Sequence, residues 1–247
     1  MSIPNSLLQD LLADFPEIRS QIYFKSSLVA LARAMEDLVL AGDDVPLVIV
    51  NYQKERFFRR DIRRYEKIAQ RTDQVYILAA PEPDSSWNVK NNQNEGNYEI
   101  IPLEASDNLV KERQLVIVGE HYTACLVGYE KSLQDNIETP MEQGDRFEGL
   151  WSFERQICQA AANWLLERII HYRPELEPKI AQAKQLYTLT AKTPTRSFLL
   201  ASHSVDLGIF AQRLITYLQA GQYKLLKAYK VISLGARRER LDRKSVV

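Results

Sequence analysis

The sequence predicts an α/β (α+β) fold: a small mixed sheet of four or five strands with flanking helices, followed by a C-terminal helical region. Two patterns favour this fold. Short apolar runs rich in β-branched residues occur at 47–50, 75–78 and 115–118, as is typical of strands covered on both faces. Segments between and after these runs carry apolar residues at helical spacing. The chain has 247 residues, 45% of them hydrophobic, and can bury a core without a metal or a disulfide.

The first half of the chain alternates between helical and extended patterns. The expected elements are a helix over 26–41, a strand over 47–50, a helix over 54–70, a strand over 75–78, a polar loop over 81–97 that carries Trp87, a short strand over 98–103, a strand over 115–118 and its antiparallel partner over 122–129. Because a helix separates the first two strands, 47–79 is expected to form a parallel βαβ unit.

A polar segment over 131–149, with one proline and two glycines, is the best candidate for a domain boundary. It divides the chain into an α/β domain over 1–149, with an N-terminal helix, and a helical region over 150–247. The expected helices of the second region cover 152–173, 175–187, 205–220 and 222–234. The basic tail over 236–244 holds five basic and two acidic residues.

Charge and cysteine usage indicate the general class of protein. Lys plus Arg and Asp plus Glu number 32 each, so the chain lacks the overall positive field of a dedicated nucleic-acid binder. Cys125 and Cys158 lie in apolar surroundings, and we expect both to be buried core residues in a reducing compartment. No apolar run approaches the roughly 18 residues of a membrane span, and the start has no leader pattern. We therefore expect a cytoplasmic chain without a membrane span.

The sequence shows no familiar catalytic or cofactor motif. The nine glycines are scattered and form no phosphate loop or dinucleotide fingerprint. The three histidines, His121, His171 and His203, have no Glu or Cys at metal-ligand spacing. Neither cysteine has a local nucleophile signature, and no nucleophile elbow occurs. We expect no enzyme activity, no cofactor and no metal site.

The segment from Lys54 to Arg71 holds eight basic and three acidic residues. If it is one helix, four cations fall within about 60° of arc opposite the apolar face: Arg56, Arg60, Arg63 and Lys67. We call these four residues the basic stripe. One interpretation is a solvated face with local ion pairs, and the other is a docking surface for an anionic ligand or an acidic partner. The exposed face has no aromatic residues for base stacking, which argues against nucleic acid.

Asn51, Tyr52 and Gln53 end the expected strand over 47–50 and lead into the helix that follows. Ligands of open α/β sheets bind beyond the carboxyl ends of the strands, where helix N-termini offer free N–H groups. Asn51, Gln53 and Arg56 are therefore candidates for the lining of a ligand pocket. The alternative is that Asn51 only caps the helix or turns the chain.

Several stretches together resemble a known family, the DICT sensory domain of cyanobacteria. They are Ser27–Asp37, Asn51–Phe57, Arg64–Pro81, Leu115–Gly119, Ala124–Val127, Trp151–Cys158, Ala161–Leu166 and Tyr172–Leu176. The resemblance covers about residues 20 to 175 and lies in the ensemble of stretches. It implies a non-catalytic input domain, which relatives couple to diguanylate cyclase, phosphodiesterase or histidine kinase modules, with a link to light responses.

The sequence departs from that arrangement because residues 177–247 carry no kinase or cyclase signature. We therefore expect a stand-alone adaptor that acts on a signalling or regulatory protein partner under light or redox control. The alternative function is the binding of a phosphate-rich ligand, a cyclic dinucleotide or nucleic acid, through the basic stripe. The apolar residues Phe210, Leu214 and Leu218 need a cover, which a homodimer or the sheet domain would supply.

Overall fold

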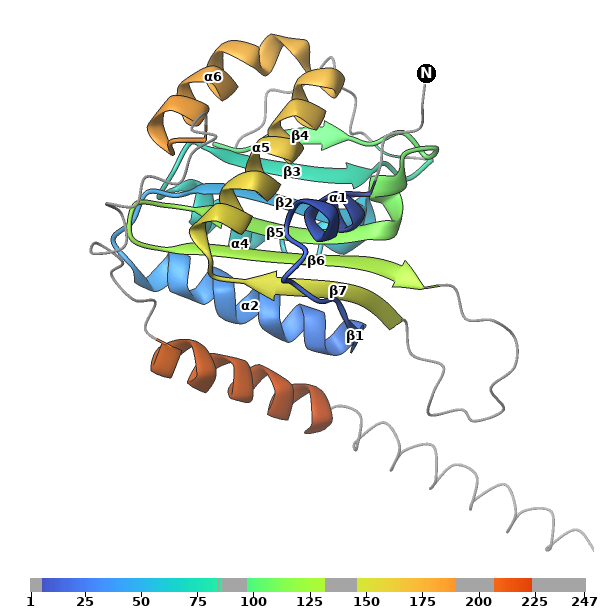
Figure 1. Ribbon diagram of the computed structural model, residues 1–247, viewed down its shortest axis with the longest axis vertical. Helices are drawn as coiled ribbons and strands as arrows, with labels where there is room; N and C mark the ends of the chain where they lie inside the picture. The colour runs from blue at the N-terminus through green and yellow to red at the C-terminus, as the bar shows by residue number, and fades with distance from the viewer. Residues whose placement is uncertain (1–5, 84, 86–96, 132–145, 190–206, 224–247) are drawn as a thin grey trace, which may run out of the picture.

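The computed structural model describes residues 6–83, 85, 97–131, 146–189 and 207–223. Its centre is one mixed sheet with the strand order β1-β7-β6-β5-β2-β3-β4 (Figure 1). The strands are β1 (Gln21–Phe24), β2 (Leu47–Lys54), β3 (Val75–Ala80), β4 (Glu99–Pro102), β5 (Glu112–Val118), β6 (Thr123–Lys131) and β7 (Arg146–Ser152). β2, β3 and β4 are parallel, and the other neighbours are antiparallel.

The α/β class and the mixed sheet are confirmed, but the sheet has seven strands instead of four or five. β4 and the hairpin of β5 and β6 lie where the sequence predicts them. The prediction missed β1 and β7. β1 has only four residues, and most of its side chains are exposed, so it carries no clear alternation. β7 begins inside the polar segment over 131–149, where the sequence indicated a linker, and the predicted boundary at residue 149 falls within this strand.

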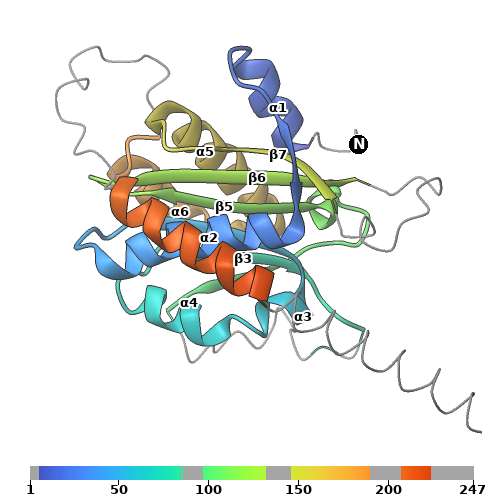
Figure 2. The same cartoon turned by 90° about the horizontal axis from the view of Figure 1, so that it is seen from below.

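The helices cover both faces of the sheet. They are α1 (Leu7–Asp14), α2 (Lys25–Ala41), α3 (Glu55–Phe58), α4 (Ile62–Ala69), α5 (Arg155–Tyr172), α6 (Glu177–Leu186) and a last helix over 207–223. Figure 2 shows α1 and α5 on one side of the sheet, and α2, α4 and the helix over 207–223 on the other. In the part of the chain that the structure describes, no helix is both long and apolar enough to cross a membrane.

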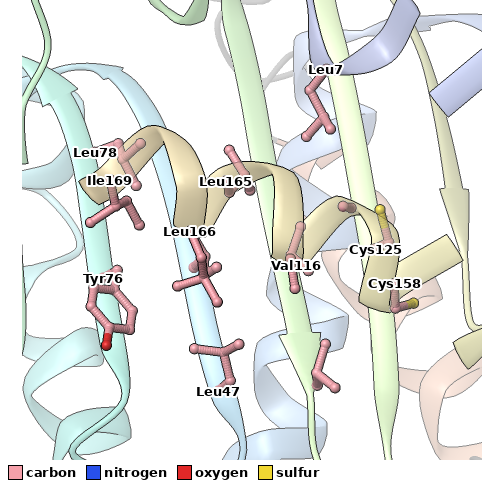
Figure 3. Close-up of a cluster of buried hydrophobic side chains, with 14 of the residues drawn as sticks. Leu7, Leu47, Tyr76, Leu78, Val116, Cys125, Cys158, Leu165, Leu166 and Ile169 are labelled. Carbon is pink, nitrogen blue, oxygen red and sulfur yellow. The ribbon is translucent and has the colours of Figure 1, made fainter. Parts of the chain in front are cut away.

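On the first face, α5 lies across the centre of the sheet. Its residues Leu165, Leu166 and Ile169 pack on apolar side chains of β2, β3 and β5 (Figure 3). Cys125 of β6 and Cys158 of α5 belong to the same cluster, and both are buried and free, as the sequence predicts. Because α5 contributes this much to the sheet's own core, the helical region and the sheet share one hydrophobic layer.

On the second face, α2, α4 and the helix over 207–223 pack on a second apolar cluster. The ring of Phe210 lies 4.9 Å from that of Phe153 and 5.9 Å from that of Trp151. Leu214 is partly buried against the same cluster, whereas Leu218 is 37% exposed. The sheet domain therefore covers two of the three apolar residues that needed a partner.

One predicted helix is divided. The segment over 54–70 contains α3 and α4, with a break at 59–61, although the parallel pairing of β2 with β3 confirms the βαβ unit. β2 also extends to Lys54, so Asn51 and Gln53 belong to the strand. The prediction did not include α1. Trp87, the segment 224–234 and the basic tail over 236–244 lie outside the described residues.

Candidate functional site

A network of charged residues is buried between α2 and α4. The carboxylate of Glu36, on α2, accepts a hydrogen bond from the guanidinium of Arg64 and one of 2.8 Å from the hydroxyl of Tyr65. Arg64 also donates to the backbone carbonyl of Arg33 at 2.9 Å. These bonds join two helices that are not consecutive in the chain. They satisfy the polar groups of Glu36, which is buried.

The network reaches the sheet through Asp61, which precedes α4. One oxygen of Asp61 accepts a 2.9 Å hydrogen bond from the hydroxyl of Tyr52, on β2. The other oxygen pairs with the guanidinium of Arg33, on α2. The ring of Tyr52 lies in an aromatic cluster with Phe58 and Tyr65, at centroid distances of 5.6 and 5.7 Å. The position of β2 is therefore linked to both helices by polar and aromatic contacts.

The same network reaches the helix over 207–223 through Asp37 of α2. Asp37 accepts a 2.6 Å hydrogen bond from Arg64 and a 2.8 Å hydrogen bond from the hydroxyl of Tyr217. Arg213 lies 3.9 Å from the same carboxylate. A continuous path of hydrogen bonds thus runs from the core of the sheet to the last described helix. We call Tyr52, Asp61, Arg33, Glu36, Arg64, Tyr65, Asp37 and Tyr217 the buried network.

Burial controls the protonation of this network. Burial raises the pKa of the Glu36 carboxyl, although the charges of Arg64 and Arg33 oppose this effect. For Arg64, burial acts to lower the pKa, but the carboxylates of Glu36 and Asp37 outweigh it and the pKa rises. Burial also raises the pKa of Tyr52 and Tyr65, so both hydroxyls stay neutral donors. Within the network, Arg64 is therefore a fixed cation, and Tyr52 and Tyr65 are neutral donors.

The members of the buried network satisfy one another's hydrogen bonds, and the network includes no Ser, Cys or His. Burial raises the pKa of Cys158 to about 12 and raises that of Cys125 as well, which keeps both thiols protonated and weakly reactive. A buried ion network with a few discrete arrangements can transmit a shift of one element to another.

The residues of the basic stripe are all exposed. Arg56 lies on α3, 3.7 Å from Glu82, and Arg60 lies in the break between the helices. Arg63 and Lys67 lie on α4. Since the helix is interrupted, the arc worked out for one continuous helix does not apply. In the described ranges, no ion pair involves Arg60, Arg63 or Lys67.

Asn51 and Gln53 have structural partners. Asn51 donates at 2.7 Å to the carbonyl of Leu109 and at 3.3 Å to Gln114, and its own oxygen accepts the backbone N–H of Gln53 at 2.8 Å. Gln53 adopts a φ of 64° at an irregularity of the pairing between β2 and β3, and its side chain donates to Glu130 at 2.9 Å. Asn51 thus anchors the end of β2, as the alternative interpretation expects, and its place in a ligand pocket stays a prediction.

One group of potential metal ligands lies at the hairpin turn, where ligand atoms of Asp44, Glu120 and His121 come within 4.8 Å of one another. The Asp44 carboxylate already accepts the backbone N–H groups of Glu120, His121 and Tyr122, at 3.2, 2.9 and 3.0 Å. Asp44 therefore stabilises the turn between β5 and β6. Its contacts account for the cluster without an ion.

Sequence reasoning missed the buried network. Glu36, Asp37 and Arg64 fall beside the apolar stripes of their helices and look like ordinary surface charges. The available signal was a concentration of charge within two segments of apparent helix, Arg33–Asp37 and Asp61–Tyr65. That signal does not say which residues face each other, because Arg64 and Glu36 are 28 positions apart.

Two family profiles match the chain. The first describes the sensory domain in diguanylate cyclases and two-component systems, DICT, and matches residues 5–131, which is more than half of the chain. The second describes the C-terminal domain of a two-partite extracellular sensor domain, CHASE6_C, and matches residues 141–227. Searches of curated proteins and of solved structures found no significant match. The region that matches the first profile contains β1 to β6 and all of the buried network except Tyr217, and the chain belongs to the DICT family of sensory domains.

Proposed function

We propose that this chain is a non-catalytic sensory or adaptor protein that passes a signal from its sheet to a protein partner through the helix over 207–223. The observation that carries this proposal is the path of hydrogen-bonded residues that begins at Tyr52 on β2 and ends at Tyr217. It runs through Asp61, Arg33, Arg64 and Asp37. Membership of a sensory family supports it. The lack of a familiar catalytic motif in the sequence supports the absence of catalysis.

We also propose a location for the chain and a stimulus to which it responds. We place it in the cytoplasm, because Cys125 and Cys158 are both free thiols in the core. We propose a light- or redox-linked stimulus in cyanobacterial signalling, on the resemblance of its sequence stretches. The outward side of the helix over 207–223 fits the role of an output surface, since Ile215 and Leu218 are exposed there.

Capture of the partner tests this function. A photo-crosslinker is placed at the exposed Gln219, and the protein is incubated with an extract of its own cells. The variant R64M breaks the network, because it leaves Glu36 and Asp37 without their shared cation. R19M is the control, since it removes an exposed arginine that lies outside both the network and the basic stripe.

We expect the unmodified protein and R19M to capture the same protein, and R64M to capture much less of it. Hydrogen exchange of residues 207–223 would rise in R64M, because breaking a buried pair from one side costs about 3 to 5 kcal/mol. Equal capture by R64M and R19M, together with unchanged exchange over 207–223, would refute the path from the sheet to the helix.

A further inference from the structure

β1 forms one edge of the sheet, and its outer side is open. The strand pairs with β7 over the four residues Gln21–Phe24. In the described ranges, no other strand pairs with these residues and no side chain forms a hydrogen bond with their backbone. Figure 2 looks onto this edge, and the chain between α1 and α2, which contains β1, crosses in front of the other strands. Backbone N–H and C=O groups on the outer side of β1 can therefore pair with a further strand.

The opposite edge strand, β4, is protected in ways that β1 lacks. The guanidinium of Arg173 donates to the backbone carbonyl of Ile100 at 3.0 Å. The carboxylate of Glu99 pairs with both Arg173 and Lys179. β4 also ends in Pro102, which has no N–H to donate. Charges and prolines of this kind prevent an edge strand from pairing with another chain, and β1 contains neither.

Two large apolar side chains of β1 are exposed. Ile22 is 61% exposed and Phe24 is 51% exposed. Because side chains alternate along a strand, both lie on one face, opposite to Tyr23, which packs on the apolar cluster of the second face. Ile22 lies beside Glu148 of β7, and Phe24 lies beside Arg146, whose guanidinium is 5.8 Å from the ring. Two apolar side chains on an open backbone edge are typical of an association surface.

We propose that two copies of this chain associate through β1, which pairs antiparallel with β1 of the partner subunit about a two-fold axis at Tyr23. A two-fold axis relates the strands of an antiparallel pair, so the same edge serves both copies. In this register Ile22 lies opposite Phe24 of the partner subunit, and the reverse pair forms at the other end of the strand. Each apolar side chain of the exposed face then covers another, and the two sheets join into one.

The residues around β1 favour this register over its neighbours. With the axis at Tyr23, each row of side chains across the interface runs from Arg146 in one copy to Glu148 in the other. With the axis at Ile22 or at Phe24, that residue would face its own copy, and its row would end in two glutamates or two arginines. The other apolar residue would then lie opposite a serine. The register at Tyr23 therefore combines apolar pairs with unlike charges at the ends of each row.

This interface is separate from the output surface proposed on the helix over 207–223. That helix packs on the second face of the sheet, whereas Ile22 and Phe24 lie on the first face and at the edge. The inference therefore does not depend on the proposed sensory function. A pair of four-residue strands buries less area than a standard interface, so we expect a reversible dimer with a micromolar Kd.

Sedimentation velocity of the full chain across the micromolar range measures this association. I22K should raise the Kd of the dimer by about 10-fold or more, because Ile22 enters the two-fold interface twice and a lysine on an edge strand opposes pairing. L186K is the matched control, since Leu186 on α6 is 66% exposed and receives the same substitution. It should associate as the unmodified chain does. I215K changes the exposed side of the helix over 207–223 and should also leave the dimer intact.

Disulfide formation between cysteine variants tests the register, and it covers the case in which I22K does not fold. The variants I22C and F24C are mixed and oxidised with copper phenanthroline, to which Cys125 and Cys158 are not accessible because both are buried. The mixed pair should form faster than either same-residue pair. Residues directly opposite each other have Cβ atoms about 4.5 to 5.5 Å apart, whereas the same-residue pairs lie on diagonals of about 7 to 8 Å.

The inference is overturned if the unmodified chain stays monomeric throughout, or if I22K associates as tightly as L186K. Loss of the dimer in I215K but not in I22K would place the contact on the helix over 207–223 and also overturn it. Faster disulfide formation within I22C alone or F24C alone than in their mixture would refute the axis at Tyr23.

Discussion

Glu112 gives the sharpest prediction about pH and stability. This residue begins β5 and is fully buried, where its carboxylate accepts hydrogen bonds from Ser6 and Gln114 and from the backbone N–H groups of Leu7 and Leu8. It therefore closes the N-terminus of α1 together with Ser6, the N-cap residue. Burial raises the pKa of Glu112 from its ordinary value of 4.5 to about 7, although all four donors favour the charged form.

The sign of the effect follows from the direction of this shift. Between pH 4.5 and 7 the folded chain holds a proton on Glu112 that the unfolded chain has released, so the free energy of unfolding falls as the pH rises. A pKa difference of this size corresponds to about 3 kcal/mol of unfolding free energy, and this contribution is fully lost above pH 7. Most buried carboxylates with ion partners make the free energy of unfolding rise with pH, so the opposite contribution of Glu112 should be distinguishable from theirs.

Urea denaturation of the full chain and of E112Q, followed by circular dichroism at several pH values from 4.5 to 8.5, measures this contribution. The difference in unfolding free energy between the two proteins removes the titration of all other groups. Between pH 4.5 and 8.5 we expect the unfolding free energy of the unmodified chain to fall by about 3 kcal/mol relative to that of E112Q. A difference that stays within 1 kcal/mol, or that shifts the other way, would show that the donors at the start of α1 outweigh burial.

Three further predictions concern the sheet, its turn and the basic stripe. G149A should destabilise the chain by about 3 kcal/mol in urea denaturation, since the added Cβ would come within 2.3 Å of a backbone oxygen of β6. G221A, with open space around the new Cβ, should have no such effect and is its control. D44A should lower the unfolding free energy by about 1 to 3 kcal/mol, because three backbone N–H groups of the hairpin turn lose their acceptor. If the basic stripe binds a cyclic dinucleotide or nucleic acid through all four cations, fluorescence anisotropy should show about a hundredfold weaker binding at 200 mM than at 50 mM salt, and salt-independent binding would exclude the stripe.

The hydrophobic pattern predicted the centre of the fold and failed at its edges. Central strands such as β2 and β5 are buried on both faces, so a continuous β-branched run identifies them from the sequence. β1 and β7 lie at one side of the sheet; the side chains of β1 are mostly exposed, and those of β7 alternate between buried and partly exposed over only a few residues. Such a pattern is too short to distinguish from a loop. The break between α3 and α4 was not predicted for another reason. Residues 59–61 are polar and compatible with a helix, and they include no glycine or proline.

The pocket candidates and the buried network differ in how far the sequence could indicate them. The rule that ligands bind beyond the carboxyl ends of parallel strands pointed to Asn51, Gln53 and Arg56. No such rule points to Glu36 and Arg64, because only the packing of α2 against α4 brings these two side chains together. Periodicity assigns a residue to a face of its own element, and long-range pairing decides what that face meets.

The same reasoning explains why the buried charges bear on function. Apolar side chains in place of Glu36 and Arg64 would hold α2 against α4 at least as well, since burying a charge pair rarely adds net stability. The network instead requires a defined geometry at each hydrogen bond, so that a shift of Tyr52 or Asp61 is resisted or passed on in discrete steps. An apolar interface would absorb such a shift by sliding. Charges at this position therefore agree with the proposal that a small displacement at β2 is transmitted to Tyr217.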